Sequence, residues 1–256
     1  MRGSILIVIA CFLLAGPSFA FDHNHSKWDR VLKTHLDKRF FVNYTKLAAE
    51  TKAKPTHEFL AYLKDLSNVS QGQFNGWNPQ QKMAFLINAY NAFTVKLMVD
   101  NLGPKNDRLK SIKDIGGLFT KPWSIKFFTL LGKEMSLDSI EHKMLRPVYK
   151  DYRIHAVVNC ASVSCPPLRK EAYVATKLEA QLGEQMTLWM KDKTRNKYNG
   201  TSGNWQLSKI FDWYEDDFAN WGGGVEAVVH RYRPDLEGVK MKDLDYLPYN
   251  WNLNGK

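Results

Sequence analysis

The pattern of apolar and polar positions along the chain predicts mostly helices. Several segments repeat apolar residues every three or four positions, which is the spacing of one face of a helix. Caps and breakers mark some of their ends, among them Ser136 before one segment and Pro234 after another. The expected helices are 28–36, 59–66, 82–101, 136–146, 178–190, 210–218 and 225–232.

The segment 82–101 differs from the others because its apolar side chains point in nearly every direction around a helix. A helix that is apolar all round is buried. Asn78 and Pro79 suit its first turn, Gln81 can reach back to the cap, and Gly103-Pro104 can end it. We therefore expect 82–101 to be the central helix of the fold.

Two segments alternate as strands do. Arg153–Asn159 is rich in β-branched residues, and Tyr249, Trp251 and Leu253 alternate with asparagines near the end of the chain. The sequence has no internal repeat and no long linker. The expected fold is a helix-rich α+β domain with a small antiparallel sheet, spanning 21–256.

The first twenty residues resemble a secretory signal peptide. Arg2 precedes an apolar run from Ile5 to Ala15, and small residues stand before a cut after Ala20. The run is short for a membrane span. We therefore expect cleavage, a periplasmic or secreted protein, and no membrane span in the mature chain.

Composition changes this picture only in part. The 256 residues carry a formal net charge of +10, with 44% hydrophobic and 24% charged residues, as a folded globular protein does. The basic residues are scattered, and export makes nucleic acid an improbable partner. We expect a small-molecule, peptide or cell-envelope substrate. The sequence contains no nucleotide-binding or zinc motif, so we expect no cofactor and no metal.

Glu141 conflicts with the pattern around it. It falls on the apolar stripe of the helix expected over 136–146, where a carboxylate needs a partner or a proton. Either it forms a structural ion pair, for example with Arg153, or it is an orienting or acid–base group in a cleft. The neighbouring His142 lies at the edge of the same stripe.

A second candidate group is His155 with Cys160 and Cys165. An imidazole can lower the pKa of a thiol and take its proton, which makes the thiol a nucleophile. If 153–159 is a strand, Cys160 points away from His155, so the alternation favours Cys165 as the partner of the imidazole. The alternative is a Cys160–Cys165 disulfide in an oxidising compartment.

Asn88 and Asn91 are polar positions on the otherwise apolar central helix. Buried amides need hydrogen-bond partners. We expect them to brace neighbouring loops through backbone groups. The alternative is that they line a polar cleft and orient a substrate or a histidine.

Five blocks of this sequence together resemble the domain of unknown function 547 family, whose bacterial members are often exported. Relatives are often grouped with papain-like cysteine peptidases, in the ordinary or a permuted order of elements. The resemblance implies a thiol, an imidazole and an amide or carboxylate meeting in a cleft. The blocks are AFLINAYNAFTVK (84–96), SLDSIEHKMLR (136–146), RIHAVVNCASVSCPPLRKEAY (153–173), LSKIFDWYEDDF (207–218) and YNWNLN (249–254).

The leading hypothesis is therefore a papain-like thiol hydrolase or acyltransferase acting on an amide or ester. Cys165 is the expected nucleophile with Cys160 as its substitute, and His155 is the expected base with His142 as its substitute. Glu141, Asn88 or Asn250 would orient the imidazole. The rival hypothesis is a non-catalytic envelope protein that binds a ligand or partner and holds a Cys160–Cys165 disulfide.

Overall fold

The computed structural model describes residues 20–102, 109–117, 120–199 and 201–255. The expected signal peptide, apart from Ala20, and the expected Gly103-Pro104 helix stop lie outside the described residues. In these ranges, no helix has both the length and the apolar character that crossing a membrane requires.

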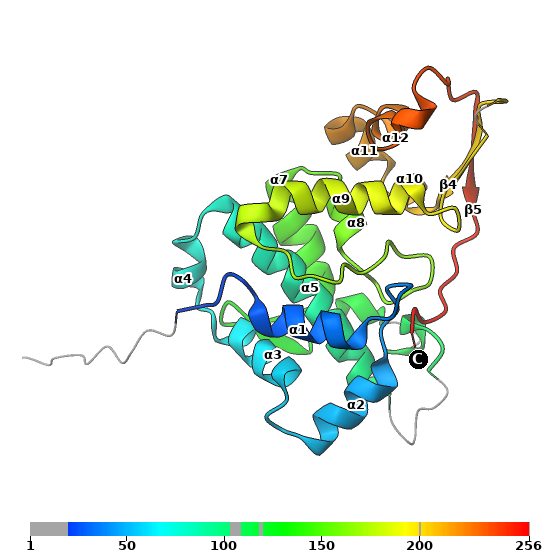
Figure 1. Ribbon diagram of the computed structural model, residues 1–256. Helices are drawn as coiled ribbons and strands as arrows, with labels where there is room; N and C mark the ends of the chain where they lie inside the picture. The colour runs from blue at the N-terminus through cyan, green and yellow to red at the C-terminus, as the bar shows by residue number, and fades with distance from the viewer. Residues whose placement is uncertain (1–19, 103–108, 118–119, 200, 256) are drawn as a thin grey trace, which may run out of the picture.

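Helices dominate the described chain (Figure 1). The α-helices are α1 (Ser26–His35), α2 (Tyr44–Ala53), α3 (Glu58–Asn68), α4 (Gln71–Asn75), α5 (Pro79–Asn101), α6 (Leu137–Ser139), α7 (Arg146–Tyr149), α8 (Ile154–Val157), α9 (Leu178–Lys191), α10 (Ile210–Trp213), α11 (Glu215–Gly222) and α12 (Val225–Tyr232). Short 3₁₀ turns are η1 (Ile112–Asp114), η2 (Pro122–Ser124), η4 (Ala175–Lys177) and η5 (Pro234–Leu236), and η3 (Ile140–Leu145) is a π-helix.

The strands form two small sheets, which makes the fold α+β as expected. Strand β1 (Phe128–Leu130) pairs antiparallel with β2 (Lys133–Met135). Strand β3 (Lys197–Tyr198) pairs antiparallel with β4 (Asn204–Ser208), and β5 (Asp243–Leu247) joins β4 in parallel.

Helix α5 is the centre of the fold, as its all-round apolar pattern predicts (Figure 1). Asn78 and Gln81 form the expected capping box at its start, and Pro79 occupies the first turn. Sixteen of its 23 residues are buried. Helices α1, α2 and α3 pack with it in one apolar cluster, while α9 to α12 and β4 contribute to a second.

The strand prediction for Arg153–Asn159 is wrong, because Ile154–Val157 forms the helix α8. Asp151 starts this turn: its side chain accepts a hydrogen bond from the Arg153 amide, and its carbonyl accepts one from the Ile154 amide. Every residue of α8 is buried. Because no face of α8 meets solvent, the alternation of residue types in this segment does not indicate the two faces of a strand.

The strand predicted over Tyr249–Leu253 is wrong too. This segment makes only isolated bridges, Asn252 with Ser111 and Leu253 with Ser162, and the last strand, β5, precedes it. The chain crosses from one apolar cluster to the other here, so successive residues meet different neighbours rather than one partner strand.

The helix expected over 136–146 begins at Ser136 as predicted but does not end at Pro147. A π-helical turn, η3, carries the chain from α6 into α7 just before this proline, which has no amide hydrogen to donate. Such wide turns often occur at functional sites. Here the turn carries Glu141 and His142.

Candidate functional site

One cleft of about 730 Å³ brings together residues from the central helix, the π-helical turn, α8, the loop after α8, α10 and the segment after β5. Five of the expected site residues line it: Glu141, His142, His155, Cys160 and Cys165. Its other walls include Tyr90, Lys113, Trp123, Asp138, Trp213, Tyr214, Tyr249 and Trp251.

The two cysteines of the cleft are free thiols whose sulfur atoms lie 3.0 Å apart. A hydrogen bond joins the two sulfur atoms, and the hydroxyls of Ser162 and Tyr249 each lie 3.3 Å from the Cys160 sulfur. The disulfide that the non-catalytic hypothesis invokes is not formed.

The two thiols have different surroundings, which shift their pKa values in opposite directions. The hydrogen bond with Cys165, helped by Ser162 and Tyr249, outweighs burial and lowers the pKa of Cys160 to about 7. Burial raises the pKa of Cys165 well above its usual value. These pKa directions favour Cys160 over the expected Cys165 as the thiol that ionises, and the strand geometry that favoured Cys165 is absent.

A tight loop presents both sulfur atoms. Ala161 adopts a left-handed backbone conformation with φ of 60°, and its amide donates to the Asn159 side chain. The Cys165 amide closes a turn to the Ser162 carbonyl. The buried Arg195 side chain donates to the Cys165 carbonyl at 2.7 Å and so fixes the far end of the loop.

His155 is almost fully buried and is held by an anchored carboxylate. Its Nε2 atom lies 2.7 Å from Asp217 Oδ2, and Arg146 contacts both oxygens of Asp217 at 2.7 and 3.0 Å. Burial alone would raise the pKa of Asp217, but hydrogen bonds from His155 and Arg146 hold it to about 2. The imidazole also stacks on Tyr214 with ring centroids 3.8 Å apart.

The ionised Asp217 fixes the tautomer of His155. A carboxylate only accepts hydrogen bonds, so Nε2 carries the proton and Nδ1 keeps its lone pair. Burial lowers the pKa of His155, which favours the neutral imidazole. Within the described residues, neither sulfur is hydrogen-bonded to an imidazole, so the thiols and His155 share the cleft without forming a direct pair.

Glu141 does not pair with Arg153, which instead contacts Asp151 and Glu179. Its Oε1 atom accepts a hydrogen bond of 3.0 Å from the Tyr214 hydroxyl inside the cleft. The exposed His142 contacts Arg146 through Nδ1 at 2.9 Å. Both residues thus surround the His155–Asp217 pair without touching the imidazole.

The three asparagines lie outside the cleft lining. Asn88 exchanges hydrogen bonds with the backbone of Tyr173, and Asn91 contacts the Val157 carbonyl and the Asn159 amide. Both brace the chain around the cleft. Asn250 is exposed, and its side chain accepts from the Asn252 amide. None of the three orients the imidazole.

Asp217 is the orienting residue that the sequence analysis missed. It follows Ile210 and Tyr214 at helical spacing, on the same stripe, as Glu141 does on its own helix. A carboxylate on an apolar stripe was therefore a usable signal in both places. Tyr249 and Ser162, which support the Cys160 thiolate, gave no such signal because they lie in irregular chain.

Residues 74–190 match the model of the family described as "Protein of unknown function, DUF547". This match supports the family resemblance and covers both cysteines, His155 and Glu141, while Asp217 and Tyr249 lie beyond it. No curated protein and no solved structure matches the chain.

Proposed function

We propose that the protein is a thiol-dependent hydrolase or acyltransferase that acts on an amide or ester. The observation that carries the proposal is the Cys160 sulfur, which three neighbouring groups stabilise as a thiolate at the wall of a large cleft. The lowered pKa of Cys160 enlarges the ionised fraction of this thiol at neutral pH, and the thiolate is the nucleophile.

In this proposal the Cys160 thiolate attacks the substrate carbonyl, and a thioester forms as the amine or alcohol leaves. Water or an acceptor then attacks the thioester and gives its proton to Nδ1 of His155. Asp217 stabilises the resulting imidazolium, as the orienting acid of a triad does. Solvent supplies the proton that the leaving amine or alcohol takes, and the imidazolium then releases its proton to solvent, which restores the neutral imidazole and the Cys160 thiolate.

The aromatic wall of the cleft indicates what the substrate offers. Trp213 is 43% exposed and stacks on Trp251, with ring centroids 5.5 Å apart. The rings of Tyr249 and Trp123 also contact the Trp251 indole, with centroid distances of 4.5 and 5.6 Å. A wall of this kind favours a substrate with an apolar or flat group beside the reacting carbonyl.

The test is whether Cys160 becomes acylated. We expect the purified protein, mixed with p-nitrophenyl acyl esters, to release p-nitrophenol and to gain the acyl mass on the peptide containing Cys160. Cys160→Ala should abolish both signals. His155→Gln should retain the first acylation and slow turnover, since the base acts on the attacking water.

Acylation of Cys165 alone, or equal release by wild type and Cys160→Ala, would refute this assignment. The proposal rests on the cleft and does not require a papain-like order of elements.

We further propose export, with cleavage after Ala20. N-terminal sequencing of the protein from a fractionated bacterial host should find Phe21 first, in the periplasm or the medium. An intact Met1 in the cytoplasm would contradict this.

A further inference from the structure

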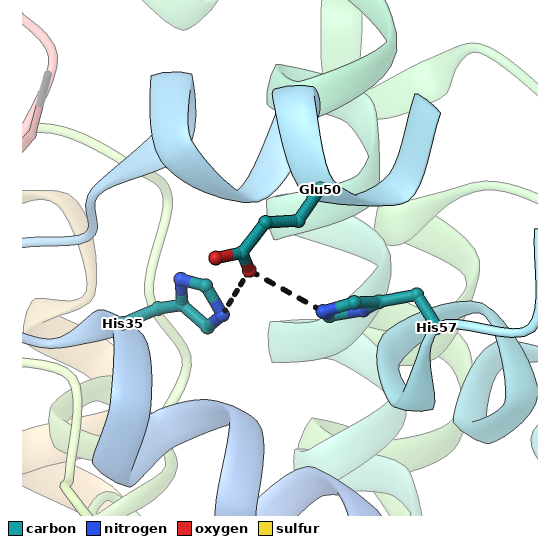
Figure 2. Close-up of side chains that lie close together, drawn as sticks. All are labelled: His35, Glu50 and His57. Carbon is teal, nitrogen blue, oxygen red and sulfur yellow. Dashed lines mark ion pairs between the residues drawn. The ribbon is translucent and has the colours of Figure 1, made fainter. Parts of the chain in front are cut away.

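A second group of chemistry-bearing side chains lies outside the cleft lining, where α1, α2 and α3 meet (Figure 2). His35 ends α1, Glu50 lies on α2, and His57 caps the start of α3. Figure 2 shows both imidazoles directed at the same carboxylate oxygen. We propose that these three residues form a Zn²⁺ site completed by water.

The distances suit zinc. Glu50 Oε2 lies 3.2 Å from His35 Nε2 and 3.4 Å from His57 Nε2. Zinc binds nitrogen and oxygen at about 2.0–2.2 Å, so ligand atoms on a tetrahedron around it lie about 3.3–3.5 Å apart. One ligand atom from each residue lies within 4.8 Å of the other two. A small movement of the two imidazole rings would therefore place the three ligand atoms at three corners of a tetrahedron around zinc.

The environment also suits the ion. The side chain of His35 is buried, with 3% of its surface exposed, so the ion would have protein on one side. The side chains of Glu50 and His57 are 37% and 17% exposed, which leaves a solvent path for the ion and for a water ligand. Two histidines and one glutamate with an open position are a ligand set that zinc uses.

One hydrogen bond gives the proposal a specific signature. In the metal-free protein His57 Nδ1 accepts from the Phe59 amide at 3.2 Å, so its ring proton is on Nε2. Zinc bound at Nε2 moves that proton to Nδ1, which can then no longer accept. Zinc should therefore release the Phe59 amide, an effect that an adventitious surface ion would not produce.

The experiment measures Zn²⁺ affinity by competition with a chromophoric chelator on the chelator-treated full chain. Glu50→Gln and His57→Asn should weaken binding about 100-fold, the upper end of the loss seen when a supporting contact is removed. Asparagine keeps an acceptor for the start of α3, so His57→Asn separates coordination from helix capping. Glu58→Gln, a nearby exposed glutamate, should bind as wild type does.

Two further measurements locate the ion. Cys160→Ala/Cys165→Ala should retain full affinity, and the Phe59 amide resonance should shift on zinc addition. No binding to wild type at micromolar zinc would overturn the proposal. Equal affinity in Glu50→Gln and wild type, or loss of binding only in the double cysteine variant, would overturn it too.

Discussion

The His155–Asp217 pair and the group of His35, Glu50 and His57 both combine histidine with a carboxylate, but their carboxylates have different neighbours. Asp217 contacts one imidazole, that of the cleft residue His155, and Arg146 contacts both of its oxygens. At the junction of α1, α2 and α3, Glu50 contacts two imidazoles, and the exposed Lys46 lies 3.8 Å away.

This difference assigns different chemistry to the same residue types. The buried, anchored Asp217 keeps one imidazole proton in place and leaves one lone pair for proton transfer. Glu50 instead draws two Nε2 atoms toward one point, which is an arrangement for holding a cation. Burial separates them as well, since the Asp217 side chain is 7% exposed and that of Glu50 is 37% exposed.

The largest effect should come from Asp217→Asn. Removing the charge leaves Arg146 and His155 without their shared partner, and breaking a buried ion pair typically costs about 3–5 kcal/mol. We expect the free energy of unfolding to fall by about 3 kcal/mol in urea denaturation, because asparagine can retain one hydrogen bond. Asp216→Asn, at the exposed neighbour, should change it by less than about 0.5 kcal/mol.

Asp217 should also make the free energy of unfolding depend on pH. The pKa of Asp217 is lowered from 3.8 to about 2 in the folded chain, so its contribution is complete above pH 3.8 and is lost as pH falls toward 2. We expect the stability advantage of wild type over Asp217→Asn to shrink across this window. An advantage that stays constant from pH 5 to pH 2 would contradict the ion-pair assignment.

Cys165→Ala tests the thiol pair of the cleft. Loss of the hydrogen bond between the two thiols should raise the pKa of Cys160 from about 7 toward its ordinary value. An ordinary thiol has a pKa near 8.5, so alkylation of Cys160 by iodoacetamide at pH 7 should slow about tenfold. Unchanged alkylation kinetics would show that Ser162 and Tyr249 suffice to stabilise the thiolate.

The smallest effect should come from Glu50→Gln in metal-free protein. Its ion pairs are partly exposed, and such pairs contribute about 0–1 kcal/mol. Urea denaturation should therefore detect a loss below about 1 kcal/mol, well under that of Asp217→Asn. A loss as large as that of Asp217→Asn would mean that the junction is a structural ion pair, and would remove the contrast between the two groups.

Much of the fold follows from the sequence, because its signals are local. The all-round apolar pattern over 82–101 gives the buried α5, and Asn78 with Gln81 gives its cap. The strand prediction for 153–159 fails because α8 is buried throughout. Burial on every side removes the periodic pattern of apolar and polar residues that would distinguish a helix from a strand.

The sequence predicts which residues line the candidate site but not the role of each residue. Glu141, His142, His155 and the two cysteines line one cleft, while their partners come from distant chain. The Tyr249 hydroxyl reaches Cys160 across 89 residues, and Asp217 reaches His155 across 62. The pKa of Cys160 depends on local contacts with Cys165 and Ser162 and also on Tyr249, and spacing along the sequence does not encode this last contact.

The segment from Tyr249 to Gly255 has a kinetic consequence. It joins the cleft to the start of the described chain, since the Tyr44 hydroxyl donates to Asn254 across 210 residues and Val42 bridges Gly255. Contacts between such distant residues form late in folding. A chain that lacks them also lacks the Tyr249 hydrogen bond to Cys160, one of the contacts that lower the pKa of this thiol, so the rate of Cys160 alkylation at neutral pH during refolding should change when this segment docks.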